Sequence, residues 1–486
     1  MKFVGRTEQL GQLMALWNKA TSSLVTCQGR RRIGKSRLMD EFAARSGCFY
    51  LKLSGLAPRK GMTNADQLRY FCQRLSEKSG DEDLAAKNWS EAFSLLNAEI
   101  SRHASEKMVV LLDEISWMGK YDVDFPGYLK DAWDDELKKH DNLILVLCGS
   151  VSSWIQKNIL DSTGFVGRIS LELVLGELPV RDCLQFWRQT ADGVSSREVF
   201  DLLSVTGGVP MYLEEIDPTL TTNENLRRMA FSKSGTLFTD FTRIFNDVFG
   251  AKATDKREIL SALAFESKTL SEITTAIGKT RNGHLSEALE ELELAGFVER
   301  DGGVNPATGR EAKIARYRIR DNYTRFYLRF IAPYAAMIRR GAFNFVSLET
   351  LPGWDTILGL QFENLVLNNV SSLIARLGLD RSLVLSATPY RKSASRSEAN
   401  ENASNAGCQI DILIQLRQAM YPVEVKRRNE IGIEVVEQMK RKVASLPNPN
   451  GVSIRPVLVY DGHLSPSVVE NAYFAATIPA SSLLLS

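Results

Sequence analysis

The chain has 486 residues, 44% of them hydrophobic and 24% charged, a composition that suits a soluble protein with several buried cores. At roughly 150 residues per domain, this length predicts about three domains. The 60 basic and 58 acidic residues nearly cancel, which excludes a whole-molecule attraction to nucleic acid, so any basic surface has to be local.

Cysteine usage and hydropathy favour a cytoplasmic location. The six cysteines show no paired spacing, which suits a reducing compartment and argues against a disulfide framework or a cysteine zinc site. No apolar stretch approaches the roughly 18 residues of a membrane span, and the amino terminus lacks a signal-peptide core. We therefore expect no contact with a membrane.

Residues 1–178 alternate between helical and strand patterns. The helical patterns cover residues 7–19, 35–45, 89–103 and 125–139. The strand patterns cover residues 23–28, 47–53, 108–112, 143–149 and 169–175. This order predicts a parallel sheet with right-handed crossovers, the core of an α/β multidomain protein.

A phosphate-binding loop follows the first predicted strand. The segment Gly29–Ser36 matches the Walker A pattern G-x-x-x-x-G-K-[ST] at every fixed position, between a strand and a helix. Gly29 and Gly34 let backbone N–H groups turn toward phosphate oxygens at the positive end of the following helix. Lys35 reaches the β- and γ-phosphates, and the Ser36 hydroxyl ligates Mg²⁺. The flanking backbone of Arg32, Ile33 and Arg37 completes the predicted nucleotide site.

Two carboxylates, Asp113 and Glu114, directly follow the continuous apolar run over 108–112. A run of this kind predicts a strand that is buried on both faces, and ligands bind at the carboxyl ends of such strands. We expect Asp113 to hold Mg²⁺ and Glu114 to polarise the attacking water. Ser150 ends the next apolar run, where it either senses the γ-phosphate or simply caps the helix that follows.

Two further segments complete a family resemblance. The opening Phe3–Glu8 and the later Thr206–Pro210, with its Gly-x-Pro signature, resemble segments of the archaeal-type ATPases, in the signal-transduction (STAND) group of the AAA+ superfamily. The resemblance covers about residues 1–250. It implies that Val4 and Gly5 lie beside the adenine of ATP or ADP and that Pro210 packs on the nucleotide from a helical lid.

Arginines near the predicted nucleotide site have two interpretations. Arg168 falls where similar proteins carry an arginine near the last core strand, which makes it a candidate γ-phosphate finger or else a surface salt-bridge residue. Arg30, Arg31 and Arg32 add positive charge near the phosphates, although we expect at least two of them to be solvated loop residues.

The middle of the chain has a purely helical pattern at first and then a pattern of helices followed by strands. Residues 179–250 suit the helical lid, and 251–320 read as a winged helix: three helices, then two strands around a turn at Asp301–Gly303. Lys279, Arg281 and Asn282 lie where a recognition helix enters the major groove, but four glutamates on that helix would repel phosphate. The winged helix is therefore either a DNA contact or a rigid spacer.

A linker segment over 321–355 is rich in aromatics, interleaved with Arg325 and Arg329. Such interleaving either stacks nucleic-acid bases or, at helical spacing, packs domains together. Further on, Arg391–Gly407 is rich in Ser, Asn and Glu and reads as a mobile surface loop.

The carboxyl-terminal residues 356–486 contain a second set of carboxylates. Asp411 lies in an alternating strand pattern, and Glu424 and Lys426 lie in the next one, where period two places both on one face. Glu363 lies on an upstream helix. These carboxylates suit one or two Mg²⁺ ions, which prefer oxygen ligands, and a metal held there activates water against a phosphodiester.

This spacing resembles the PD-(D/E)xK nuclease core. The resemblance implies metal binding by Glu363, Asp411 and Glu424, a catalytic role for Lys426, and an orienting role for Gln438 on the next helix. One departure is that no proline precedes Asp411, since Gln409 and Ile410 stand there.

The sequence as a whole predicts an ATP-binding, ATP-hydrolysing switch that controls a nuclease-like domain acting on DNA or RNA. Two alternatives remain open. One is an ATP-responsive DNA-binding regulator whose last domain is inert, and the other is a scaffold that forms nucleotide-dependent homo-oligomers.

Overall fold

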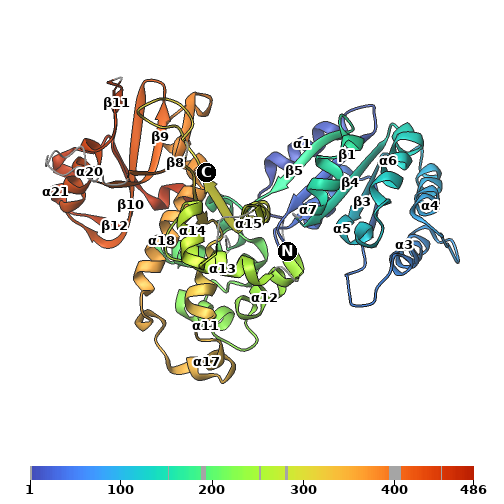
Figure 1. Cartoon of the computed structure of the whole chain (residues 1–486), viewed down its shortest axis with the longest axis horizontal. Coiled ribbons are helices and arrows are strands. Elements are labelled where there is room, and N and C mark those ends of the chain that lie inside the picture. The colour runs from blue at the N-terminus through green and yellow to red at the C-terminus, as the bar shows by residue number, and fades with distance from the viewer. Residues whose placement is uncertain are drawn as a thin grey trace. The chain divides into compact units, whose positions relative to one another are not determined.

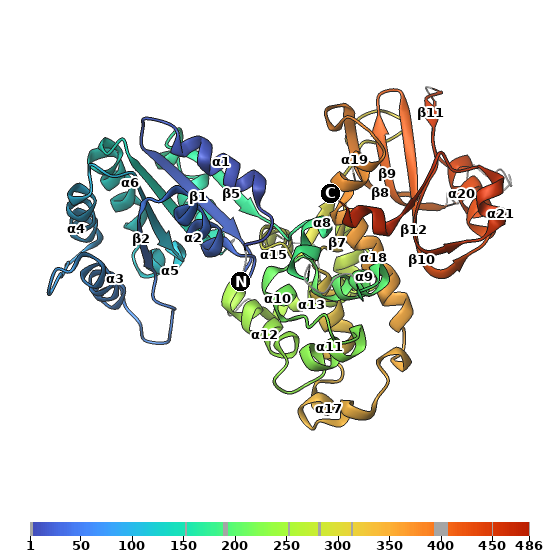
Figure 2. The same ribbon diagram turned by 180° about the vertical axis from the view of Figure 1, so that it is seen from behind.

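The computed structural model describes residues 3–150, 153–187, 193–250, 253–279, 283–312, 314–392, 407–449 and 451–485. The chain divides into two compact units (Figures 1 and 2). The first comprises Met1–Leu178 with Leu294–Gly296, and the second comprises Pro179–Glu293 with Phe297–Ser486. Each unit is described by itself.

The first unit contains a five-stranded sheet in the order β2-β3-β4-β1-β5, and every neighbouring pair is parallel. Its strands are β1 (Ser23–Gly29), β2 (Phe49–Ser54), β3 (Met108–Asp113), β4 (Leu143–Ser150) and β5 (Ile169–Leu175). All residues of the three central strands β3, β4 and β1 are buried, which explains their continuous apolar runs. The predicted parallel sheet is confirmed.

Helices pack on this sheet in a largely apolar core that includes Trp89, Phe93 and Phe125. They are α1 (Thr7–Trp17), α2 (Lys35–Ser46), α3 (Asn64–Ser79), α4 (Trp89–Arg102), α5 (Ile115–Met118), α6 (Phe125–Asp135) and α7 (Ser153–Ile155). Helix α3 has no counterpart among the predicted elements. It carries a capping box between Thr63 and Asp66 and buries Leu68, Phe71 and Leu75 at helical spacing, so the signal was present in the sequence.

The second unit begins with helices that follow the first sheet in the chain. They are α8 (Val180–Cys183), α9 (Ser196–Thr206), α10 (Pro210–Glu215), α11 (Thr222–Ala230) and α12 (Thr236–Phe249). Three more follow, α13 (Ala253–Leu263), α14 (Leu270–Ile277) and α15 (Gly283–Leu294), and then the antiparallel strands β6 (Val298–Asp301) and β7 (Arg316–Ile319). The connection between these strands is longer than the predicted turn at Asp301–Gly303, because it extends from Gly302 to the start of β7 and contains the bridge between Val304 and Glu311.

The aromatic segment after β7 forms part of a packed core. Tyr323 and Phe326 lie on α16 (Asn322–Phe326), where Tyr323 contacts Tyr212 and Phe326 contacts Phe231. Both rings are at most 1% exposed, so they cannot stack on nucleic-acid bases, and the packing interpretation holds for them. The short helix α17 (Ala335–Arg339) follows.

The last part of the second unit is built on a mixed sheet (Figures 1 and 2, orange to red). Its order is β13-β12-β10-β9-β8, with β11 added beside β10. Strands β8, β9 and β10 pair antiparallel, whereas β10, β12 and β13 pair parallel. The elements are α18 (Trp354–Asn368), α19 (Val370–Arg376), β8 (Val384–Lys392), β9 (Cys408–Leu416), β10 (Ala419–Ile431), α20 (Glu434–Ala444), β11 (Ser453–Ile454), β12 (Val457–Leu464), α21 (Pro466–Asn471) and β13 (Ala476–Pro479).

The predicted surface loop over 391–407 is partly a strand, because Arg391 and Lys392 belong to β8. Residues 393–406 lie outside the described part of the chain. Among the described residues, no helix is both long and apolar enough to cross a bilayer.

Candidate functional site

The phosphate-binding loop joins β1 to α2 in a backbone shape that its sequence dictates. Arg32 and Gly34 both have positive φ, 70° and 89°, which turns successive peptides inward. A Cβ on Gly29 would lie 2.6 Å from the carbonyl oxygen of Leu175 on β5, so only glycine fits there. Lys35 Nζ donates to the carbonyls of Gly29 and Arg30, at 2.9 and 3.2 Å, which holds its ammonium inside the loop.

The structure brings Ser36 and the acidic end of β3 together. Ser36 Oγ donates to Asp113 Oδ2 at 2.8 Å, so the hydroxyl and carboxylate predicted to share a Mg²⁺ ion are adjacent. Burial raises the pKa of Glu114, and the charge of Asp113 adds to this, while Lys35 and Arg31 oppose it. The Ser150 N–H also hydrogen-bonds Glu114, and the Ser150 hydroxyl is buried with no hydrogen-bond partner among the described residues.

Sequence reasoning missed the part played by Arg6. Its guanidinium donates to the carbonyl of Ile33 at 3.1 Å and to that of Gly176 at 2.6 Å, which ties the opening segment to the phosphate loop and to the residue after β5. Arg6 is only 8% exposed. The sequence feature that could have pointed to Arg6 is the glycine before it. Gly5 has φ 68°, which lets the chain turn just before Arg6. Val4 is half-buried beside it.

The three loop arginines differ in their exposure to solvent. Arg30 is buried and lies 3.6 Å from Glu177, while the guanidinium of Arg31 lies 5.1 Å from the ring centre of Trp117. Arg32 is half-buried, and Arg37 is exposed on α2. Arg30 is therefore not a solvated loop residue, whereas Arg31 and Arg32 are both partly exposed to solvent.

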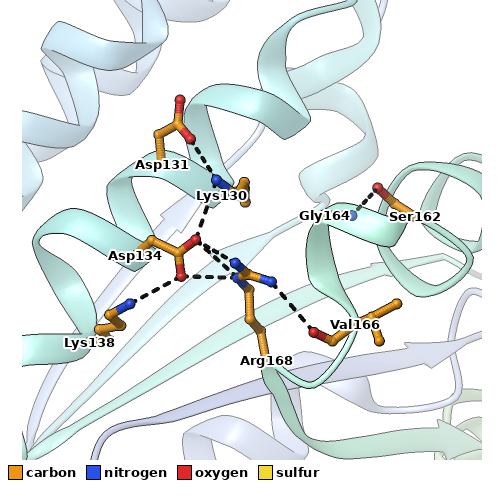
Figure 3. A network of polar contacts seen from close by, with 8 residues as sticks. All are labelled: Lys130, Asp131, Asp134, Lys138, Ser162, Gly164, Val166 and Arg168. Atoms are coloured by element: carbon orange, nitrogen blue, oxygen red, sulfur yellow. Dashed lines mark hydrogen bonds and ion pairs between the residues drawn. The ribbon is translucent and has the colours of Figure 1, made fainter.

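Arg168 lies at the wrong end of its strand for a γ-phosphate contact within its own unit. It precedes β5, whose first residue pairs with Leu24, whereas the last pairs with Gly29. At about 3.3 Å per residue, the start of β5 is roughly 20 Å from the phosphate loop. Figure 3 shows Arg168 bound instead to Asp134, with Nε–Oδ1 at 2.9 Å and Nη2–Oδ2 at 2.7 Å. The structure therefore has the salt bridge and not the finger.

The comparisons with known proteins bear on this unit. Residues 3–216 match the family described as an ATPase domain predominantly from Archaea. This segment is an archaeal-type ATPase domain. The family match supports ATP binding by the ATPase domain, in agreement with the adjacent Lys35, Ser36 and Asp113.

A curated relative matches over a longer stretch. The uncharacterized protein MJECL04 of Methanocaldococcus jannaschii is 24% identical over 362 residues, which is 74% of this chain and 75% of the relative. The match therefore extends past the ATPase domain, but the relative's name indicates no activity.

Solved structures show weaker likenesses. The Walker-type ATPase PABY2304 of Pyrococcus abyssi is 17% identical with a TM-score of 0.46, covering 68% of this chain and 96% of its own. The ORC2 protein of Aeropyrum pernix, in ADPNP-ADP complexes, is 13% identical with a TM-score of 0.42, covering 68% and 91%. No functional conclusion about this chain follows from these scores.

The second unit assembles the late carboxylates where two strands separate. The β9–β10 ladder ends with the pair Val423–Ile412, so Asp411 and Glu424 are the next residues on the two strands. The Asp411 carboxylate accepts a hydrogen bond from the N–H of Val425 at 2.8 Å, which replaces the strand pairing there. Because the strands part at this point, acidic side chains fill the opening.

Three carboxylates share this opening. Burial raises the pKa of Glu363 to about 8, and the charge of Asp411 adds to it. Burial also raises the pKa of Asp411 to about 6, with a contribution from Glu424. Glu363 lies on α18, so these three carboxylates come from a helix and two strands.

Two lysines balance this negative charge. Lys426 Nζ lies 2.6 Å from Glu424 Oε1, and Lys442 Nζ lies 2.5 Å from Glu424 Oε2. Glu424 is only 1% exposed. The Lys426 contact agrees with the period-two expectation. Lys442 was missed, although it lies one helical turn after Gln438 on α20 and so on the same face; Gln438 itself is half-buried.

The donor chemistry of the cluster fits a divalent cation, since carboxylate oxygens are the ligands that Mg²⁺ and Mn²⁺ prefer. The charges of neighbouring carboxylates also raise the pKa of Glu363 and of Asp411, and a bound cation would oppose this effect. As the side chains stand, no three His, Cys, Asp or Glu residues among those described are grouped to surround a metal ion. Glu424 would therefore have to exchange at least one lysine for the cation.

The other predicted contacts are placed as follows. Pro210 begins α10 in the second unit. Lys279 is paired with Asp255 at 3.0 Å and with Glu258 at 2.7 Å, which neutralises it as a DNA contact. Arg281 and Asn282 lie outside the described residues.

Arg325 is buried and donates to Gln361 Oε1 at 3.0 Å, so it serves packing.

Proposed function

We propose that the protein is an ATP-binding and ATP-hydrolysing switch whose second unit carries a metal-dependent nuclease-like site acting on nucleic acid. The observation that carries the effector half is the convergence of Glu363, Asp411 and Glu424, together with Lys426, where β9 and β10 separate.

In the ATPase half, Lys35 leaves the loop carbonyls to meet the β- and γ-phosphates. Ser36 and Asp113 are the residues that would hold Mg²⁺, and Glu114, with its raised pKa, orients the attacking water. Ser150, whose buried hydroxyl has no hydrogen-bond partner among the described residues, would sense the γ-phosphate. We further propose that Val4 and Gly5 contact adenine and that Pro210 contacts the nucleotide from a lid formed by α8–α12.

In the effector half, the support comes from the elements that carry the site residues. Glu363 lies on the helix α18, Asp411 on the strand β9, and Glu424 and Lys426 on the next strand β10. These are the element types that the resemblance to the PD-(D/E)xK core implies for them, which supports the proposal. The Pro missing before Asp411 is replaced by Ile410, which is fully buried.

The chemistry follows from the residues. A divalent cation bound by the carboxylates would supply an activated water and stabilise charge on the phosphodiester. Lys426, once separated from Glu424, has its ammonium free to position that water or to neutralise the charged transition state. Glu363 has to lose its proton before it can bind a cation, because its pKa is raised to about 8.

A cleavage assay tests this function. Wild-type protein is incubated with supercoiled DNA, single-stranded DNA or RNA, with Mg²⁺ or Mn²⁺, and with ATP, ADP or no nucleotide. We expect metal-dependent cutting that Glu424→Gln and Lys426→Ala abolish and that Lys35→Ala makes independent of nucleotide. Absence of cutting by wild type under all these conditions would end the nuclease proposal.

One observation favours an alternative, a nuclease fold that binds nucleic acid or protein without cutting. Lys426 and Lys442 already neutralise Glu424, so the site is charge-balanced without a metal. In that case the switch acts as an ATP-responsive DNA-binding regulator or as an oligomerising scaffold. A change in molecular mass with ATP but no cleavage would favour the scaffold.

A further inference from the structure

Two consecutive arginines of the phosphate loop extend toward opposite sides of the parallel sheet. Arg30 lies 3.6 Å from Glu177, two residues after the end of β5. The guanidinium of Arg31 lies over the ring of Trp117, 5.1 Å from its centre, and Trp117 belongs to α5, which follows β3. Because β5 and β3 lie on opposite sides of the pair β4–β1 (Figure 1), Arg31 and not Arg30 is on the side of the acidic end of β3.

This side of the loop is where we propose that hydrolysis occurs. Ser36 Oγ donates to Asp113 Oδ2 at 2.8 Å, and Glu114 directly follows Asp113. Burial raises the pKa of Glu114, and the charges of Lys35 and Arg31 oppose that increase. Both cations therefore lie close enough to act on the carboxylate that orients the attacking water, which is also the side that the γ-phosphate would occupy.

Trp117 is fixed beside Glu114 by its own turn and by the end of β2. The N–H of Trp117 donates to the carbonyl of Glu114 at 2.8 Å. A Cβ on Gly55 would lie 3.0 Å from the Cβ of Trp117 and 2.8 Å from the carbonyl oxygen of Glu114, so the chain after β2 packs closely on this turn. The Gly55 N–H also donates to the carbonyl of Asp113 at 2.9 Å. The base of the Trp117 side chain is thereby held, and its ring gives the guanidinium a defined place.

The chemistry of hydrolysis requires a cation at this place. Water attacks the γ-phosphorus, the bond from that phosphorus to the bridging oxygen breaks, ADP leaves with the electron pair, and the released phosphate takes up the hydroxyl and the proton of that water. Positive charge at the γ-phosphoryl oxygens stabilises this transition state. A guanidinium stacked on an aromatic face keeps its N–H donors in a plane parallel to the ring, and this planar fork matches phosphate oxygens. Arg168 does not supply this cation within its own unit, because it precedes β5 at the far end of the strand.

We propose that Arg31 contacts the γ-phosphate of ATP and stabilises its charge in the transition state, and that Trp117 is the positioning residue that aligns the Arg31 guanidinium. The proposal rests on the proposed function, since it needs ATP bound at Gly29–Ser36 and hydrolysed there. The arginine is then supplied by the same chain as the phosphate loop.

Two probes isolate the γ-phosphate in a binding test. Full-length wild type and Arg31→Ala are titrated with ADP alone and with ADP plus aluminium fluoride, which takes the place of the phosphoryl group in transfer. We expect ADP affinity to stay within about twofold of wild type and the affinity gained from aluminium fluoride to fall about 100-fold. Arg31→Lys keeps the charge but not the planar fork, so it should retain part of that gain.

Hydrolysis at saturating ATP gives the second readout. Arg31→Ala should lower kcat about 100-fold, and millimolar guanidinium should restore part of the rate, which a merely structural role would not allow. Trp117→Ala should lower kcat about tenfold, because the guanidinium is no longer aligned. Trp117→Phe should stay closer to wild type, since it keeps an aromatic face. Arg45→Ala is the matched control, at an exposed position of α2 that pairs with Glu41.

The outcomes separate this proposal from the proposed function. Wild-type hydrolysis that Arg31→Ala leaves unchanged would overturn the role of Arg31 while the ATPase activity stands. An equal loss of ADP binding in Arg31→Ala, without rescue by guanidinium, would show that Arg31 shapes the loop and does not act on the γ-phosphate. A wild-type kcat in Trp117→Ala would overturn the positioning role alone. Absence of hydrolysis by wild type would overturn the proposed ATPase activity, and the catalytic role of Arg31 with it.

Discussion

The molecule contains two acidic sites, one at the end of β3 and one within β9 and β10, and the lysines of the two sites have different partners. In the ATPase domain, Lys35 bonds backbone carbonyls and Asp113 bonds a serine hydroxyl. In the second unit, Lys426 and Lys442 both bond the carboxylate Glu424. In the first site the ammonium is held by neutral carbonyls, whereas in the second two ammonium groups already neutralise a carboxylate.

The difference also concerns how the sites are built. The phosphate loop is local, since its shape depends on a few backbone angles within Gly29–Ser36. The late site takes side chains from α18, β9, β10 and α20. A nonlocal site depends on the packing of those elements, and so we expect remote changes to disturb it more than they disturb the phosphate loop.

Loss of Lys35 should have the largest effect. Lys35→Ala removes the charge that meets the β- and γ-phosphates, so ATP hydrolysis should fall about 100-fold or more, measured by phosphate release. Lys60→Ala, at an exposed position, is the control. Hydrolysis that survives Lys35→Ala would mean that the activity belongs to another site.

Glu363 should make the metal-free protein less stable at high pH. Its folded pKa of about 8 lies above the roughly 4.3 of an exposed glutamate. The folded state therefore holds a proton that the unfolded state has released, so stability is lost as pH rises from about 4.3 to 8.

Denaturant unfolding in EDTA should show a loss of about 3.5 kcal/mol between pH 5 and pH 8. Glu363→Gln keeps the shape of the side chain and removes the titration, so its stability should change less over that interval. Parallel pH profiles for the two proteins would show that Glu363 titrates normally.

Arg6 should affect nucleotide affinity without affecting the late site. Arg6→Ala removes two buried hydrogen bonds to the carbonyls of Ile33 and Gly176, so ATP affinity should fall about tenfold. Fluorescent nucleotide titration measures it, with the exposed Arg69→Ala as control. An affinity equal to that of wild type would show that the phosphate loop holds its shape without Arg6.

Arg168 should matter least. Arg168→Ala removes the contact with Asp134, in which the Arg168 guanidinium lowers the pKa of the Asp134 carboxyl. This contact lies far from the phosphate loop. We expect a hydrolysis rate within about twofold of wild type and a slightly lower melting temperature. A large loss of hydrolysis would restore the finger assignment.

Local patterns were readable from the sequence, and contacts across long separations were not. The apolar runs predicted the sheet because strands buried on both faces leave that trace, and Gly29–Ser36 predicted the loop because its chemistry needs fixed residues. Arg6 was missed because its partner carbonyls lie 27 and 170 residues away.

The late site was predictable only in part. Glu424 and Lys426 followed from strand periodicity, but Lys442 depends on how α20 packs against β10, which the sequence does not show. The two alternatives for Arg168 could have been separated earlier, since a residue before a parallel strand lies at the edge opposite the phosphate loop.

Mn²⁺ binding by nucleotide-free protein tests the central claim most directly, with wild type compared to the triple variant Glu363→Gln, Asp411→Asn and Glu424→Gln. We predict that wild type binds Mn²⁺ at a site that the triple variant lacks, while the variant still binds ATP. Identical Mn²⁺ binding by two folded proteins would contradict a metal site at the late carboxylates.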